Sequence, residues 1–115
     1  MDAFLAAYLE CAAWSSTGDD GESLESREFS PEALKQAAEE CAAFVLAAGP
    51  MLDAWDDSQA GHDFWLTRNG HGAGFWDRQA EDNSPMPFRD ELSELAHKAG
   101  ERELYPGDDG LLYFA

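Results

Sequence analysis

Residues of metal-binding type lie close together in the middle of the chain. They are His62, Asp63, His71 and Asp77. A cross-strand pair in a hairpin could bring two of them together, but their spacing matches neither the HExxH nor the CxxC pattern that fixes a tetrahedral zinc. We therefore predict no metal and no cofactor. A metal-binding or enzymatic protein that uses His62, His71 and nearby carboxylates remains the minor alternative.

Other catalytic signatures are weak. The chain has no GxSxG motif, and Cys11 and Cys41 lie in Ala-rich surroundings that predict buried free thiols rather than nucleophiles. The glycines of residues 69–74 do not open a helix, so they lack the free amides of a phosphate site. Residues 108–110, Asp-Asp-Gly, are typical of a turn and lack the spacing of a calcium loop. We expect a protein that is not an enzyme.

Charge is the outlying property. The chain carries 24 Asp and Glu against 7 Lys and Arg, a formal net charge of −17, and such an excess destabilises a compact state by self-repulsion. Three explanations stay open: a surface for a basic partner, adaptation to high salt, and plain solubility. Residues 1–60 hold 13 acids and 2 bases, and residues 61–115 hold 11 and 5. The first half is therefore the more negative one.

Carboxylates at neighbouring helix positions lie roughly 5–6 Å apart. DNA presents a phosphate every ~3.4 Å of axis per strand, so a few helix-borne rows of carboxylates together can approximate its charge spacing. A DNA-mimic surface would therefore bind a basic, nucleic-acid-binding protein and not nucleic acid itself. The acidic candidates are Asp19, Asp20, Glu22, Glu25, Glu28, Glu32, Glu39, Glu40, Asp53, Asp56 and Asp57. An exposed aromatic and arginine patch is the second candidate for partner binding, and it consists of Trp65, Arg68, Trp76 and Arg78. The alternative is that this face packs against the C-terminal residues.

The helices and strands that position these residues are predicted from hydrophobic periodicity and from residue types that start or end such elements. Helices are expected at residues 2–16, 31–48 and 87–99, with Asp2 and Ser30-Pro31 as start signals. The apolar stripe of the helix predicted at residues 2–16 could end at Trp14. The stripe of the helix predicted at residues 31–48 includes Leu34, Val45 and Leu46. Residues 15–29 read as an acidic loop, and residues 51–57 as one short helical turn.

Two β-hairpins complete the prediction. Residues 63–68 and 73–78 are aromatic strands around the Asn69-Gly70 turn, and residues 103–105 and 111–114 flank a second turn. We thus expect a single domain, residues 1–115, of the α+β class: about three helices packed on a small antiparallel sheet formed by two β-hairpins. The chain shows no transmembrane stretch and no signal-peptide start, which favours a cytoplasmic location.

The segment GHDFWLTRNGHGAGFWDR, residues 61–78, resembles a family of small acidic proteins encoded by bacteriophages, and residues 8–17, 96–97 and 107–110 extend the similarity. The family has no established activity, so the resemblance transfers no residue roles. It implies a phage product in a host bacterial cytoplasm. The expected function is stoichiometric inhibition of a host DNA-handling or defence protein, of restriction or CRISPR type. The alternative is a small interaction module that mimics no DNA.

Overall fold

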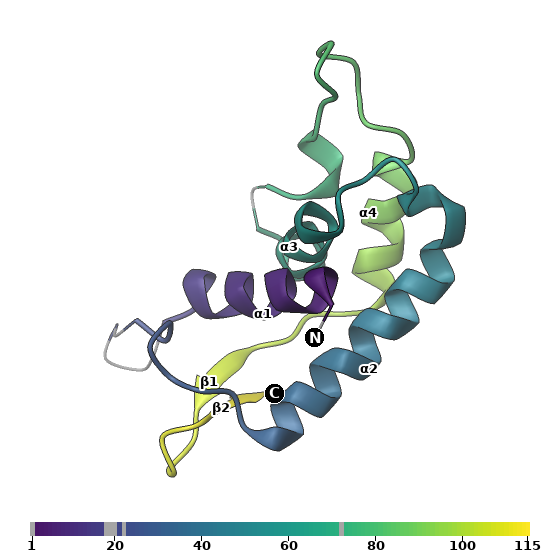
Figure 1. Ribbon diagram of the computed structural model, residues 1–115. Helices are drawn as coiled ribbons and strands as arrows, with labels where there is room; N and C mark the ends of the chain where they lie inside the picture. Colours follow the sequence, from purple (N-terminus) through teal and green to yellow (C-terminus); the bar gives the residue numbers. More distant parts are fainter. Residues whose placement is uncertain (1, 18–20, 22, 72) are drawn as a thin grey trace.

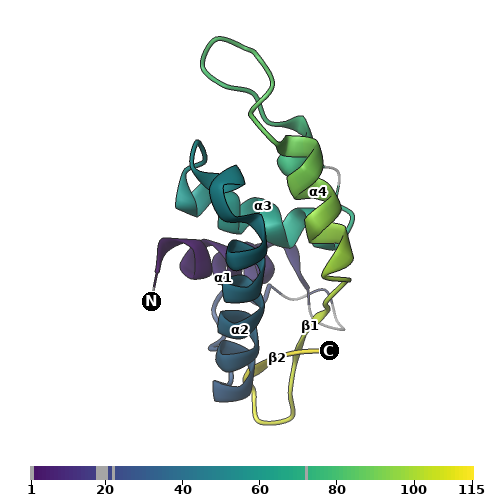
Figure 2. The same ribbon diagram turned by 90° about the vertical axis from the view of Figure 1, so that its right-hand side faces the viewer.

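A computed structural model describes residues 2–17, 21, 23–71 and 73–115 (Figure 1). Within these residues, four α-helices, two 3-10 helices and two strands follow one another: α1 (Ala3–Ser15), α2 (Pro31–Ala48), η1 (Gly49–Leu52), α3 (Asp57–Arg68), η2 (Phe75–Asp77), α4 (Arg89–Lys98), β1 (Leu104–Pro106) and β2 (Leu112–Phe114). The molecule measures 45 × 26 × 22 Å. Figure 2 shows α2 along the long axis, with β1 and β2 at one end and the loop before α4 projecting at the other.

Local capping starts three of the helices. Asp2 accepts from the Leu5 amide at 2.7 Å, and Ser30 accepts from the Ala33 amide at 3.0 Å, ahead of a proline in the first turn. These two starts confirm the predictions for α1 and α2. Asp56 caps α3 in the same way, through the Gln59 amide at 3.0 Å. That third start opens a helix in the segment where a strand was predicted.

The central hairpin prediction is wrong. Residues 63–68 belong to helix α3, and part of the predicted return strand forms η2. Asn69-Gly70 ends the helix instead of turning a hairpin: Asn69 is the C-cap, and Gly70 adopts φ +69°. Both structures use positive φ after a polar residue, so the dipeptide alone does not distinguish them. The prediction of three helices on two hairpins is therefore replaced, in the part of the chain that the structure describes, by four α-helices and one two-stranded sheet, still in the α+β class.

The C-terminal hairpin prediction is confirmed. β1 and β2 pair antiparallel, with Leu104 opposite Phe114 and Pro106 opposite Leu112. The main chain of β2 also joins the sheet to the start of α2, because the Ser30 amide donates to the Leu112 carbonyl at 2.9 Å. The hairpin thereby closes one end of the core.

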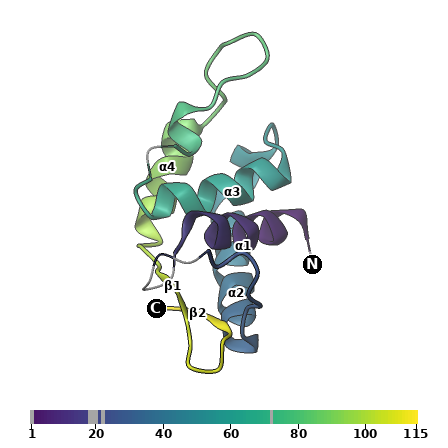
Figure 3. The same ribbon diagram turned by 90° about the vertical axis from the view of Figure 1, so that its left-hand side faces the viewer.

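An aromatic core explains why α3 is helical and central. α1 makes its most extensive contact with α3, and Figure 3 shows the two helices lying one above the other. The Phe64 ring stacks on Phe44 from α2 at a centroid distance of 4.2 Å and on Tyr8 from α1 at 5.4 Å. Because partners surround it, α3 buries every residue from Asp63 to Arg68. Such a helix has no polar stripe, which removes the periodicity that would have identified it.

Helix α2 is rotated relative to the predicted stripe. Its buried residues are Ala33, Ala37, Cys41, Phe44 and Ala48. Leu34, Val45 and Leu46 face outward, and Leu46 is 84% exposed. Small residues at every third or fourth position let α2 approach the core closely, so that Phe44 fills the space. The burial predicted for Cys11 and Cys41 is confirmed, and both are free thiols.

Candidate functional site

The arginines of the chain are turned inward. Arg68, which is 2% exposed, donates from Nη1 to Glu40 at 2.5 Å and to Tyr8 Oη at 3.1 Å. Its Nε and Nη2 donate to the carbonyls of Gly100 and Ala99 at 2.7 and 2.9 Å. The second oxygen of Glu40 accepts from Arg102 Nε at 3.0 Å. One half-buried carboxylate therefore holds two arginines.

Arg78 is held by a second buried carboxylate. Asp63 is fully buried and accepts from Arg78 Nε and Nη2 at 2.7–3.1 Å, while Gln59 donates to it at 3.0 Å. The remaining arginines donate to backbone carbonyls: Arg27 to Gly110 at 3.2 Å and Arg89 to Arg78 at 2.9 Å. All five arginines thus make internal hydrogen bonds, and Arg68, Arg78 and Arg102 pair with the two carboxylates Glu40 and Asp63.

The Glu40 ion pairs make stability sensitive to acid. Burial raises the pKa of the Glu40 carboxyl, but hydrogen bonds from Arg68, Gln36 and Arg102 outweigh burial and leave this pKa below its usual value. A lowered folded-state pKa stabilises the fold above the unfolded pKa, and this contribution is lost as pH falls. We expect the native protein to lose stability between roughly pH 5 and pH 3 more steeply than Glu40→Gln. Urea unfolding at the two pH values measures the difference.

The exposed neighbour Glu39 provides the control for this prediction. Glu39→Gln removes the same charge one residue earlier, where the carboxylate only approaches Lys35 at 4.0 Å on the surface. It should leave the steepness of the acid transition unchanged. If Glu40→Gln and the native protein lose stability in parallel, the proton taken up on acid unfolding does not belong to Glu40.

Most carboxylates predicted to bind a partner lie at the surface. The exposed ones are Glu25, Glu28, Glu32, Glu39, Asp53, Asp56 and Asp57. Glu40 is half-buried and occupied by Arg68 and Arg102, so it is not free to meet a partner. Asp19, Asp20 and Glu22 lie outside the described residues.

The predicted aromatic and arginine patch is not formed. Trp65 is 2% exposed and donates its indole N–H to Ser15 Oγ at 2.7 Å, and Arg68 is buried beside it. The hairpin prediction placed Trp65 or Trp76 beside Arg68 on an outer face. Trp65 and Arg68 are instead buried because the segment is a helix enclosed by its neighbours. Arg78 is half-buried against Asp63, and Trp76 is 48% exposed. The prediction that Trp65 and Arg68 are surface residues is wrong.

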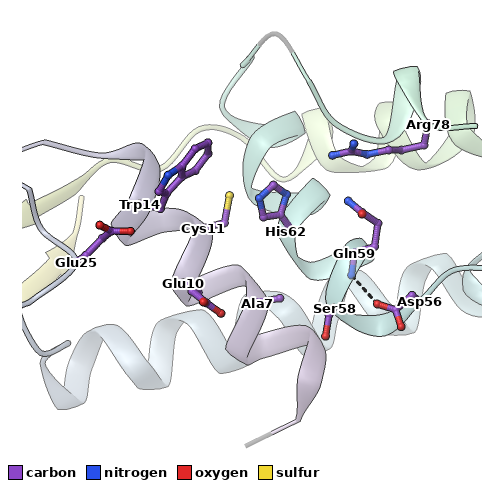
Figure 4. A pocket seen from close by; sticks show the side chains of 10 residues that line it. All are labelled: Ala7, Glu10, Cys11, Trp14, Glu25, Asp56, Ser58, Gln59, His62 and Arg78. Atoms are coloured by element: carbon purple, nitrogen blue, oxygen red, sulfur yellow. Dashed lines mark hydrogen bonds between the residues drawn. The ribbon is translucent and has the colours of Figure 1, made fainter.

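A cleft of about 580 Å³ lies between α1 and the first half of α3 (Figure 4). Residues from both helices, the acidic loop and the segment after η2 line it: Ala7, Glu10, Cys11, Trp14, Glu25, Asp56, Ser58, Gln59, His62 and Arg78. Trp14 is 63% exposed, and its ring centroid lies 6.2 Å from that of His62. Sequence reasoning assigned Trp14 to the apolar stripe. Its spacing of four from Glu10 and seven from Ala7 places it on the cleft side of α1.

The cleft lacks an activated nucleophile among the described residues. Burial, and then the nearby Asp63 carboxylate, raise the pKa of the Cys11 thiol to about 12, so Cys11 is protonated at neutral pH. His62 Nδ1 is buried and finds no hydrogen-bond partner in the described part of the chain, with Asp63 Oδ1 3.7 Å away. His71 lines a different depression, beside Ser15 and Asn69. The two histidines considered for a metal site therefore do not share this cleft.

No group of three or more His, Cys, Asp or Glu side chains is arranged to hold a metal ion within residues 2–17, 21, 23–71 and 73–115. Over the same residues, no helix has the length and apolarity needed to cross a membrane. Comparison with protein-family models, curated proteins and solved structures finds no match. The resemblance to phage proteins stays a prediction, and function must be argued from the surface itself.

Proposed function

We propose that this protein is a stoichiometric inhibitor whose acidic surface occupies the nucleic-acid-binding site of a basic host protein. The inward-turned arginines carry the proposal. Arg68, Arg78 and Arg102 pair with Glu40 and Asp63, so three of the seven basic side chains, in a chain with 24 acidic ones, are engaged by two carboxylates inside the protein. They are not available to neutralise the exposed acids.

The linear charge density supports the comparison with DNA. A formal charge of −17 over a long axis of 45 Å is one net charge per 45/17, or about 2.6 Å. Duplex DNA carries one per about 1.7 Å. A protein with about two thirds of the linear charge density of DNA would compete for basic clefts by the same electrostatics. The resemblance to phage proteins makes a host defence nuclease or its effector complex the proposed target, in the host cytoplasm.

Neutralising acids in the first half of the chain tests this function. A host protein is first captured from lysate with the native protein. The triple variant Glu32→Gln, Glu39→Gln and Asp57→Asn should bind it about tenfold more weakly, if each contact contributes roughly 0.5 kcal/mol. The native affinity should itself fall steeply between about 50 and 200 mM salt. Both affinities are measured by calorimetry with the purified partner.

A matched control separates position from total charge. Glu91→Gln, Glu94→Gln and Glu101→Gln remove the same three charges at exposed sites in the second half of the chain, and should weaken binding less. A gel-shift experiment with the partner and its DNA gives the decisive result. Displacement of DNA supports mimicry, whereas a ternary complex of partner, DNA and this protein contradicts it.

The exposed face of α2 supports a second candidate function, an interaction module without DNA mimicry. Leu46 and Val45 are exposed, and residues 41–52 carry no charge in this strongly acidic chain. An apolar patch of this kind is typical of protein interfaces. If Leu46→Asp abolishes partner binding while the acidic triple variant does not, the apolar face is the binding surface.

A further inference from the structure

The cleft between α1 and α3 combines negatively charged side chains with an exposed aromatic surface. Three of its lining residues are carboxylates that come from three segments: Glu10 on α1, Glu25 in the acidic loop and Asp56 at the start of α3 (Figure 4). All three are exposed residues. A volume of about 580 Å³ lies within the range of ligand pockets, roughly 300–1,000 Å³.

Trp14 supplies an exposed aromatic wall, with the His62 ring 6.2 Å from it between centroids. It has nearly two thirds of its surface open, whereas Trp55 and Trp65 are buried and donate their indole N–H groups to Pro87 O and Ser15 Oγ. Exposing a large indole in water gives up its burial energy. An open indole face flanked by carboxylates attracts a cation through its quadrupole.

Arg78, the arginine among the described residues that line the cleft, does not reverse this preference. Arg78 lines the cleft, but its Nε and Nη2 are bound to Asp63, which is fully buried. The charges of Arg78 and Asp63 therefore compensate one another. Glu10, Glu25 and Asp56 remain, and the mouth of the cleft is negative.

We propose that this cleft binds the guanidinium group of an arginine side chain on the partner. The inference rests on the proposed function, since a basic nucleic-acid-binding surface is where such arginines are found. A guanidinium fits better than an ammonium because it is planar, weakly hydrated, stacks on an aromatic face and pairs with a carboxylate through two parallel N–H groups. In this arrangement the guanidinium stacks on Trp14 and donates to Glu10 or Glu25.

The four indole N–H signals provide a direct test by NMR. Labelled protein is titrated with N-acetyl-arginine N-methylamide, and the signals are assigned with Trp14→Phe and Trp76→Phe. We expect the Trp14 signal to move in a saturable way while Trp76, exposed elsewhere, does not. The citrulline analogue, which has the same shape without the charge, should leave Trp14 in place. The lysine analogue should bind more weakly than the arginine one.

Single-charge variants sharpen the test. Glu10→Gln should weaken binding of the arginine probe about threefold, and Glu94→Gln, which removes the same charge on α4, should leave it unchanged. An unshifted Trp65 signal confirms that each variant is folded. Equal movement of Trp14 and Trp76, an equal effect of citrulline, or movement of Trp14 by acetate would overturn the proposal.

The two proposals fail in different ways. If the probe binds at Trp14 but the protein displaces no DNA from its partner, the guanidinium site is supported and the inhibitor function is contradicted. If the acidic triple variant loses the partner while the probe leaves Trp14 unmoved, the inhibitor function stands and the guanidinium site falls.

Discussion

Replacing Arg68 by Met is expected to lower the free energy of unfolding by about 3–5 kcal/mol, the cost of breaking a buried ion pair from one side. The substitution keeps most of the side-chain volume but removes the donors to Glu40, Tyr8 and the carbonyls of Ala99 and Gly100. Tyr8 is buried and Glu40 is half-buried, so both lose a partner that water replaces only in part. For a domain whose total stability is roughly 5–15 kcal/mol, this loss brings it close to unfolding.

Urea unfolding followed by circular dichroism measures this effect, and Arg102→Met is the matched control. Arg102 binds the same carboxylate as Arg68, but a third of its side chain is exposed, so its loss should cost only about 1 kcal/mol. Arg68→Lys should restore little, because an ammonium cannot reach acceptors spread around a planar fork. Equal losses for the Arg68 and Arg102 variants would show that the buried position carries no special cost.

Replacing Gly61 by Ala is expected to destabilise the protein by about 3 kcal/mol, as overpacking against an immovable neighbour does. A Cβ at Gly61 would lie 2.0 Å from the carbonyl oxygen of Phe4 and 2.8 Å from its carbonyl carbon. These are backbone atoms of α1, so no rotamer change relieves the overlap. The helices must move apart, which loosens the packing between Phe4 and Phe64.

The direction of the Gly61 effect distinguishes this contact from ordinary helix propensity. In an unobstructed helix interior, Gly→Ala stabilises by up to about 1 kcal/mol. Ser58→Ala on the exposed first turn of α3 is the control, and it should stay within about 0.5 kcal/mol of the native protein. Thermal and urea unfolding of both variants give the comparison. A stabilised Gly61→Ala protein would mean that α1 and α3 are not in contact at this point.

The sequence predicted the exposed carboxylates of the candidate site but not the cleft between α1 and α3. Seven of the predicted carboxylates are exposed, because charged side chains of this kind stay in water unless an ion pair holds them. Glu40 is such an exception, and its partners Arg68 and Arg102 lie 28 and 62 residues away in sequence. Trp14 and His62 meet only because α1 packs on α3. No local pattern contains that information.

The sequence by itself determined the net charge, two helix starts and the C-terminal hairpin. The Asp2 and Ser30 caps bond to amides three residues ahead, so the signal and its effect lie within one turn of chain. Only the tertiary structure decided that residues 57–68 form a helix. Residues 63–68 are buried on all sides, so neither helical nor strand periodicity marks them, and Asn69-Gly70 suits the end of either element. Its conformation follows from the surfaces of α1, α2 and α4 that enclose it.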